Sequence, residues 1–242
     1  MVSIRNDLKA LCSECGSEMV KGDLIPRNCV RCGKEFVDDE VCMNGHYVCE
    51  DCRKESASKV IYRICSESDS RDPIALAIEI MSDRRIRMHD MKHHVLVGAC
   101  LLTAYKNSGG DIDLDKALRM MEKRGSWFPA GVCGLCGTCG AAASTGTFYS
   151  IITNSSPHSK GTWSESINMT STSLAKIAEI DGPRCCKRNS FLAIYNACDY
   201  VKEKFGIEMR PTKDVVCTFS DRNDECVGKA CPFFTRGPGS RS

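Results

Sequence analysis

The spacing of apolar residues along the chain changes near residue 57. Between residues 10 and 55 aliphatic residues are few, and they offer too little apolar surface for an ordinary core. From residue 57 onward apolar residues recur at helical spacing. This pattern predicts a small N-terminal module over 10–55 and a helical domain over 57–234. The polar last residues, 235–242, are expected to form a disordered tail.

Residues that start and end helices divide the second part further. Asp72 and Pro73 are typical of an N-cap and the first position of a helix. Asp113 and Gly125 enclose another amphipathic helix in the same way. The other expected elements are helices from 88 or 90 to 107, over 140–153, over 171–180 and over 189–205, and a short strand over 215–219. The predicted fold class is therefore mainly α.

Composition and charge exclude several classes of protein. The chain has 242 residues and 42% hydrophobic residues, enough for one domain with a real core plus a small module. A net charge of +2 argues against a dedicated nucleic-acid or membrane-surface protein. No apolar run reaches the length of a membrane span, and the first residues lack the apolar core of a signal peptide. We therefore expect a cytoplasmic protein whose cysteines are metal ligands or catalytic thiols rather than disulfides.

The 18 cysteines change the picture most, because many are spaced as metal ligands are. In a Cys-x2-Cys turn both sulfurs can reach one metal ion, and two such pairs complete the tetrahedron that zinc prefers. Four protein ligands leave no open position, so the ions would be structural and would supply folding energy that the module otherwise lacks. The predicted ligands of two zinc ions are Cys12, Cys15, Cys29, Cys32, Cys42, His46, Cys49 and Cys52.

Two arrangements of these ligand pairs are open. In a sequential arrangement the first two pairs hold one ion and the last two hold the other. In a cross-braced arrangement the first and third pairs share one ion, and the second and fourth share the other. Cross-bracing is favoured because the last two pairs lie close together in sequence, within 42–52, and would be cramped around one ion.

Three of the five histidines, His89, His93 and His94, lie within six residues. If one helix includes both His89 and His93, their four-residue spacing puts them on one face. Two histidines placed in this way can chelate a metal ion or act as an acid–base pair. The alternative is an exposed helix start surrounded by basic residues.

Glycines and cysteines alternate in the segment GVCGLCGTCG, which contains Cys133, Cys136 and Cys139. The segment leads into a helix, whose N-terminal amides favour anions and thiolates. The spacing resembles the first three ligands of a bacterial ferredoxin, so a [4Fe–4S] cluster is a candidate cofactor. The fourth ferredoxin ligand is missing at the expected place. The alternative is a glycine-rich packing turn with idle thiols.

The adjacent cysteines Cys185 and Cys186 lie at the start of a helix between Arg184 and Lys187. Cations and the helix dipole stabilise thiolates, so one cysteine is a candidate nucleophile and the other a candidate ligand; a structural role is the alternative. The C-terminal segment offers further ligands, which would bind their own metal ion or complete the central site. These further ligands are Cys217, Cys226 and Cys231, whereas Cys65, Cys100 and Cys198 are expected to be isolated or in the core.

Four longer motifs carry a resemblance: C-x2-GHYVC-x2-C, MHDMKHHVLVGACLLTAY, RG-x3-PAGVCG-x2-G-x-CGAA and GPRCCKR. With these motifs the chain resembles an uncharacterised family of cysteine-rich proteins from methanogens and other anaerobic microbes, sometimes joined to a methyltransferase-like domain. The resemblance covers nearly the whole chain and implies an anaerobic setting without an established activity. Where that family has Gly-Pro-Glu, this chain has Asp90-Met91-Lys92, so no acid stands at residue 92.

Together these features predict a zinc-binding N-terminal module followed by a helical domain with a short cysteine-rich C-terminal segment. The favoured function is an intracellular enzyme of anaerobic metabolism that uses thiolates or an iron–sulfur cluster in sulfur, methyl-group or cofactor chemistry. Its substrate would be an unidentified small molecule or protein, and a methyltransferase-like or other protein is an expected partner. The alternatives are a non-catalytic zinc adaptor and a thiol redox sensor. The catalytic candidates are His89, His93, His94, Cys185 and Cys186; the cofactor-binding candidates are Cys133, Cys136, Cys139, Cys217, Cys226 and Cys231.

Overall fold

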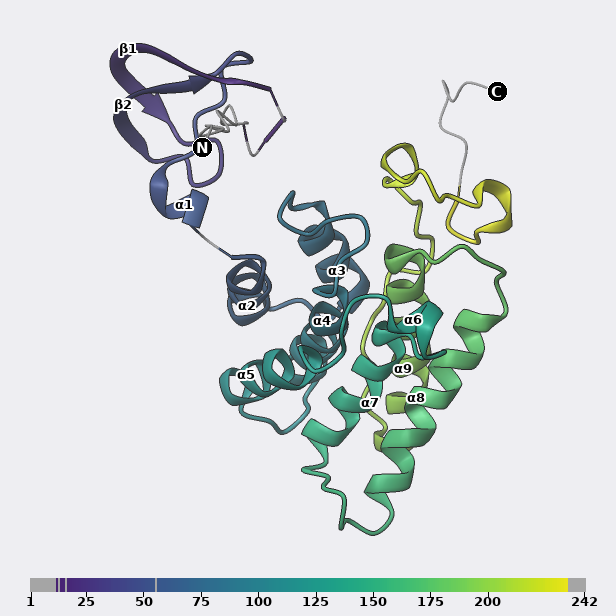
Figure 1. Ribbon diagram of the computed structural model, residues 1–242. Coiled ribbons are helices and arrows are strands. Elements are labelled where there is room, and N and C mark those ends of the chain that lie inside the picture. The colour runs from purple at the N-terminus through teal and green to yellow at the C-terminus, as the bar shows by residue number, and fades with distance from the viewer. Residues whose placement is uncertain (1–11, 13, 16, 55, 235–242) are drawn as a thin grey trace, which may run out of the picture. The chain divides into compact units, whose positions relative to one another are not determined.

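The computed structural model describes residues 12, 14–15, 17–54 and 56–234. The predicted tail at 235–242 lies outside these described residues. The chain divides into two compact units, residues 1–56 and residues 57–242 (Figure 1). The prediction of a mainly α fold is confirmed, with one small sheet in the first unit.

The N-terminal unit is a β-hairpin followed by a short helix. Strands β1 (Met19–Asn28) and β2 (Glu35–Cys42) pair antiparallel, and helix α1 spans Glu50–Lys54. The hairpin was not predicted, because its apolar side chains are largely exposed and do not mark a buried face. Among the described residues of this unit, the buried cluster consists of Cys29, Tyr47, Val48 and Cys49. So small a core fits a unit that depends on bound metal.

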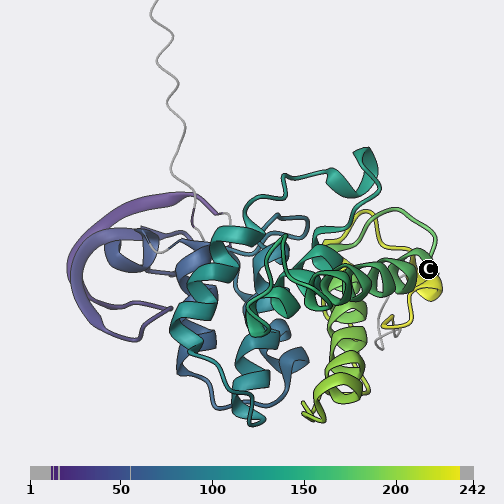
Figure 2. The same ribbon diagram turned by 90° about the horizontal axis from the view of Figure 1, so that it is seen from below.

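In the helical unit, the other helices are arranged around one buried helix, α4 (His93–Asn107; Figures 1 and 2). Every side chain of α4 from His93 to Tyr105 is buried, and this helix packs against α2, α3, α5, α7 and α9. The helices of the described part span Ala57–Glu67 (α2), Pro73–Ser82 (α3), His93–Asn107 (α4), Leu114–Gly125 (α5), Val132–Leu135 (α6), Gly140–Ile152 (α7), Thr162–Ala178 (α8) and Cys186–Phe205 (α9). Two short 3-10 turns follow, at Ser220–Arg222 and Gly228–Ala230.

Local chemistry explains most of the helix ends. The Asp72 carboxylate accepts hydrogen bonds from the backbone N–H groups of Ile74 and Ala75, at 2.9 and 3.0 Å, so it is the predicted N-cap of α3. Gly206 ends α9 with a φ of 66°, a left-handed conformation that suits glycine. Helix α8 is longer than predicted and begins at Thr162 instead of residue 171.

Two sequence predictions are corrected in this unit. Helix α4 begins at His93, because the Asp90 carboxylate accepts from the N–H of Lys92 and turns the chain just before it. His89 therefore lies outside the helix that was predicted to hold both histidines. The strand predicted over 215–219 is irregular, since a single backbone hydrogen bond, from Cys217 N to Phe233 O at 2.8 Å, ties it to a neighbouring segment.

Candidate metal and thiolate sites

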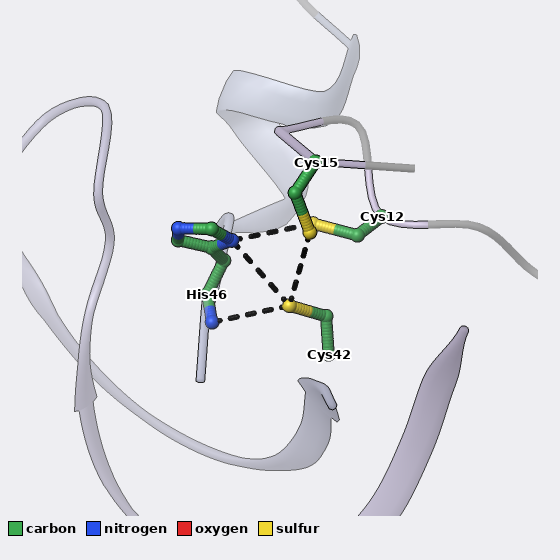
Figure 3. Close-up of side chains that lie close together, drawn as sticks. All are labelled: Cys12, Cys15, Cys42 and His46. Carbon is green, nitrogen blue, oxygen red and sulfur yellow. Dashed lines mark hydrogen bonds between the residues drawn. The ribbon is translucent and has the colours of Figure 1, made fainter. Parts of the chain in front are cut away.

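The first candidate metal site joins Cys12 and Cys15 to Cys42 and His46 (Figure 3). Their ligand atoms lie within 4.8 Å of one another. The Cys15 and Cys42 sulfurs are 3.7 Å apart, and the Cys42 sulfur is 3.5 Å from His46 Nδ1. Zinc–sulfur bonds of about 2.3 Å separate two sulfurs of a tetrahedron by about 3.8 Å. The spacing of these side chains therefore fits one tetrahedral ion.

The second candidate site joins Cys29 and Cys32 to Cys49 and Cys52, again with all ligand atoms within 4.8 Å. The sulfurs of Cys32 and Cys49 are 3.9 Å apart. The first ligand pair thus meets the third, and the second meets the fourth. This is the cross-braced arrangement, which was favoured over the sequential one.

Backbone N–H groups point at several of these sulfurs. Glu14 N donates to Cys12 Sγ and His46 N donates to Cys42 Sγ, each at 3.3 Å. Burial opposes ionisation of Cys29, but backbone N–H donors lower its pKa to about 6. Hydrogen bonds from Ser17 lower the pKa of Cys15 to about 5. Each site therefore contains one sulfur that is a thiolate at neutral pH, which is the form that binds metal.

The three clustered histidines have separate environments. The His93 ring is buried and donates from Nδ1 to the Asp90 carbonyl at 2.8 Å, and burial lowers its pKa to about 3, so it is neutral. His94 donates from Nδ1 to the Phe128 carbonyl at 3.0 Å. His89 lies 3.1 Å from the side-chain oxygen of Asn223. Within the described part of the helical unit, no three His, Cys, Asp or Glu ligand atoms come within 4.8 Å of one another, so these histidines do not form a single-ion site.

A cleft of about 580 Å³ opens beside the glycine–cysteine segment. Cys133 and Cys139 line it from one side, whereas Cys136 is exposed and does not line it. Cys139 is the N-cap residue of α7, and its sulfur accepts a hydrogen bond from Asn189 Nδ2 at 3.6 Å. Polar side chains from the start of α9 and the loop before it line the other side; they are Arg184, Arg188 and Asn189.

Cys186 lies near Cys139 and is less reactive than its position in the sequence suggested. The two neighbouring cations and the helix start predicted a stabilised thiolate. Burial instead raises the pKa of Cys186 to about 11, with a smaller contribution from the nearby Cys139 sulfur. At neutral pH this residue is therefore a protonated thiol. The sequence could not reveal this, because the burial comes from packing between helices that are distant along the chain.

A second, narrower cavity borders Cys185. Four cysteines line it: Cys185, Cys217, Cys226 and Cys231. Three of them belong to the predicted C-terminal ligands, and the fold brings them to Cys185 rather than to Cys133, Cys136 and Cys139. Arg188, one of the cations beside the cysteine pair in the motif GPRCCKR, lines both this cavity and the cleft. Sequence reasoning missed Asn223, whose amide donates to Cys185 Sγ at 3.8 Å and which belongs to no recognisable motif.

Comparison with known proteins relates the helical unit to one family. The model of a family described as "Family of unknown function (DUF5714)" matches residues 61–234. No curated protein and no solved structure matches the chain. None of the helices in the described residues has the length and apolar character needed to cross a membrane.

Proposed function

Since the chain belongs to the DUF5714 family, whose function is unknown, we propose a function from the residues themselves: a metalloenzyme with a thiolate-lined cleft. The N-terminal module folds around two zinc ions, and the helical domain carries out the chemistry. The observation that carries this proposal is the cleft itself. There two thiols, Cys133 and Cys139, face two cations, Arg184 and Arg188, from a distant part of the chain.

Zinc is the metal that the ligand chemistry of the module favours. One set has three sulfurs and an imidazole, and the other has four sulfurs. Sulfur and imidazole ligands in tetrahedral spacing are typical of structural zinc, and four protein ligands leave no position for a substrate. The module is therefore a folding unit rather than the reactive centre.

The cleft suits an anionic substrate. Arg184 and Arg188 supply positive charge, and the N-terminus of α9 adds its dipole. Glu225 also lines the cleft, but it lies 3.8 Å from Arg184 and offsets only part of that charge. Cys139 is the proposed nucleophile, and Cys133 is the second thiol of the cleft. The Cys139 thiolate would bond to a methyl group or a sulfane sulfur of an anionic donor, and the rest of the donor would leave with the electron pair of the broken bond.

The same proposal covers the setting of the enzyme. Thiolate chemistry requires reduced cysteines, so we propose that the protein is cytoplasmic. The anaerobic setting is proposed from the resemblance to proteins of anaerobic microbes. We also propose an iron–sulfur cluster in the helical domain, which would provide a Lewis acid or an electron carrier beside the cleft. A methyltransferase-like or other protein partner remains a prediction from the sequence.

Charge-selective alkylation tests the cleft. Iodoacetate is anionic and iodoacetamide is neutral. The rate of alkylation by iodoacetate divided by the rate by iodoacetamide therefore rises with the positive charge near a thiol. We expect this ratio to be higher at Cys139 than at the exposed Cys136, and to fall in Arg184→Gln. Rates at each thiol are measured by peptide mass spectrometry without oxygen. Equal ratios at Cys139 and Cys136 would contradict the proposal.

A zinc adaptor is the second candidate function, and one observation favours it. Apolar side chains are exposed on and beside the hairpin; Leu24 is 70% exposed, Val37 63% and Met43 68%. Exposed apolar side chains often mark a protein-binding face. Photo-crosslinkers at residues 24 and 37 in cells should capture one common protein if the module is an adaptor. Different proteins at the two positions, or none, would count against this function.

A further inference from the structure

The narrow cavity beside Cys185 is built from three separate segments of the helical unit. Cys185 is the N-cap residue of α9, Cys217 lies in the segment that returns along α9, and Cys226 and Cys231 flank the second 3-10 turn. The cavity has about 380 Å³ of empty space, of which about 20 Å³ can hold the centre of a water molecule. Free space of this size excludes an organic substrate, and the lining side chains would have to move apart around any larger group.

Three of the four sulfurs accept a hydrogen bond from the backbone. Phe219 N donates to Cys217 and Gly228 N donates to Cys226, both at 3.4 Å, each from two residues further along. The zinc ligand Cys12 has the same turn, with Glu14 N at 3.3 Å. The third is Cys185, which accepts from Arg188 N at 3.5 Å. At Cys231 the nearby backbone N–H of Phe233 opposes the rise in pKa that burial causes.

These hydrogen bonds stabilise sulfur in its thiolate form, which is the form that binds metal. The isolated cysteine Cys198 provides a contrast. It lies within α9, and no backbone N–H of the described residues donates to its sulfur. Burial does not separate the two kinds of cysteine, because it raises the pKa of Cys217 and Cys231 as well as that of Cys198; the backbone donors do separate them.

The spacing of the four sulfurs distinguishes a single metal ion from an iron–sulfur cluster as the group that they could bind. No three of them have sulfurs that all lie within 4.8 Å of one another, although every one of these residues is described. A single zinc ion would hold its sulfurs about 3.8 Å apart. A cubane iron–sulfur cluster places four irons between its ligands and so spreads the sulfurs wider. The cavity thus matches a cluster better than one ion.

The surroundings supply charge and exclude water. Arg188 is 4% exposed, and its guanidinium donates to the Pro183 carbonyl and the Asn189 side chain. No carboxylate of the described residues lies within salt-bridge distance of Arg188, so its positive charge is uncompensated. A cluster held by four thiolates is anionic and would compensate it. The rings of Phe191, Phe219 and Phe233 form the apolar wall.

A second layer of contacts orients one ligand. The Asn223 amide donates to Cys185 Sγ at 3.8 Å, and its oxygen lies 3.1 Å from His89 Nε2. If Nε2 carries the proton, it donates to that oxygen and fixes the amide so that the NH2 group faces the sulfur. Such outer contacts are typical of metal sites. His89 would then be a positioning residue rather than a ligand.

We propose that Cys185, Cys217, Cys226 and Cys231 are the four ligands of a cubane iron–sulfur cluster. The assignment replaces the run Cys133, Cys136 and Cys139, whose spacing resembled ferredoxin but whose side chains do not reach this cavity. This assignment deepens the proposed function, because it names the ligands of the proposed cluster. It rests on the proposed function only for the link between the cluster and the cleft, since Arg188 lines both the cavity and the cleft.

The test uses the full chain, purified without oxygen and then incubated with ferrous iron and sulfide. We expect a brown protein that binds iron and acid-labile sulfide in equal amounts, about four of each per chain. Cys217→Ser and Cys226→Ser should each lose most of the iron, whereas the matched control Cys136→Ser, an exposed cysteine outside the cavity, should keep it. Circular dichroism and zinc content show whether each variant is folded.

A second measurement needs no variant. Iodoacetamide labelling of the wild-type chain, with and without bound iron and sulfide, should show protection of Cys185, Cys217, Cys226 and Cys231 and none at Cys136. A third zinc ion in place of iron, no bound metal, or iron that survives Cys226→Ser but not Cys136→Ser would overturn the assignment. The charge-selective alkylation of Cys139 is read separately, so failure of the cleft and failure of the cluster are distinguishable.

Discussion

The N-terminal module and the helical domain gather their thiols in different ways. In the module, a single tight turn brings Cys29 and Cys32 together whatever the rest of the chain does. In the helical domain, Cys185 meets Cys217 and Cys231 only because the C-terminal segment packs on α9, where the Phe191 and Phe233 rings lie 5.2 Å apart. Spacing in the sequence therefore predicts which cysteines meet when they lie in one turn. It does not predict which cysteines meet when distant segments must pack together.

The difference extends to stability. The core of the module consists of four residues, two of them cysteines, whereas the helical domain has a continuous core around α4. We expect the module to depend on its ions and the helical domain on packing. Single substitutions in each unit separate dependence on metal ions from dependence on packing, and the largest effect is expected in the module.

Cys49→Ser should unfold the module and leave the helices intact. A structural zinc site contributes on the order of 10 kcal/mol, far more than so small a core can replace. Zinc content should fall, and the amides of β1 and β2 should lose protection from hydrogen exchange. The helical circular dichroism signal should remain, as it should in the control Cys136→Ser. If the amides of β1 and β2 stayed protected from hydrogen exchange after the loss of zinc, the module would not depend on its ions, and the two units would not differ in this respect.

Acid should weaken the helical domain through His93. Its pKa is lowered from 6.5 to about 3 by burial, with a smaller contribution from Lys187, so the unfolded chain binds its proton first. The stability from the neutral ring is complete above pH 6.5 and is lost as the pH falls toward 3, by a few kcal/mol. His93→Gln should flatten this fall in denaturant titrations followed by helical signal, and the exposed His158→Gln should not. Parallel curves for both variants would exclude His93 as the cause.

Gly140→Ala should destabilise the helical domain by about 2 kcal/mol. A methyl group at residue 140 would lie 2.1 Å from the His94 ring, which packs directly on the backbone beside Cys139. Gly134→Ala is the matched control, since a methyl group there meets nothing within 4 Å. Chemical denaturation measures both. Equal stability of the two variants would mean that His94 does not pack on the start of α7.

Asp72→Ala should have the smallest effect, about 1 kcal/mol, because it removes the N-cap of α3. Asp224→Ala, in an exposed loop, should change little. Thermal denaturation at helical wavelengths distinguishes the two. A loss from Asp72→Ala as large as that from Cys49→Ser would show that the helical domain, too, depends on single features.

Local signals in the sequence were enough for the fold class and for the two groups of residues in the module that could hold metal. Caps such as Asp72 and turns such as Cys49-x2-Cys52 carry their own geometry, so the sequence displays them. The hairpin went unseen because Leu24 and Val37 face solvent and give no buried alternation. The helix that begins at His93 was predicted to begin at residue 88 or 90, because the turn at Asp90 does not change the pattern of apolar residues.

The reactive part of the helical domain was predicted as a set of residues rather than as a geometry. Spacing singled out Cys139 and Cys185, but it could not show that one faces the cleft and the other the narrow cavity. It also could not show that burial raises the pKa of Cys186. Those properties depend on how α7, α9 and the C-terminal segment pack.

One paired measurement tests the central claim that the two units hold different metals by different ligands. Zinc, iron and sulfide are counted per chain in anaerobically prepared Cys49→Ser and Cys226→Ser. We predict that Cys49→Ser loses zinc and keeps iron and sulfide, and that Cys226→Ser loses iron and sulfide and keeps both zinc ions. Loss of the same metal from both variants, or of zinc alone from Cys226→Ser, would contradict the account.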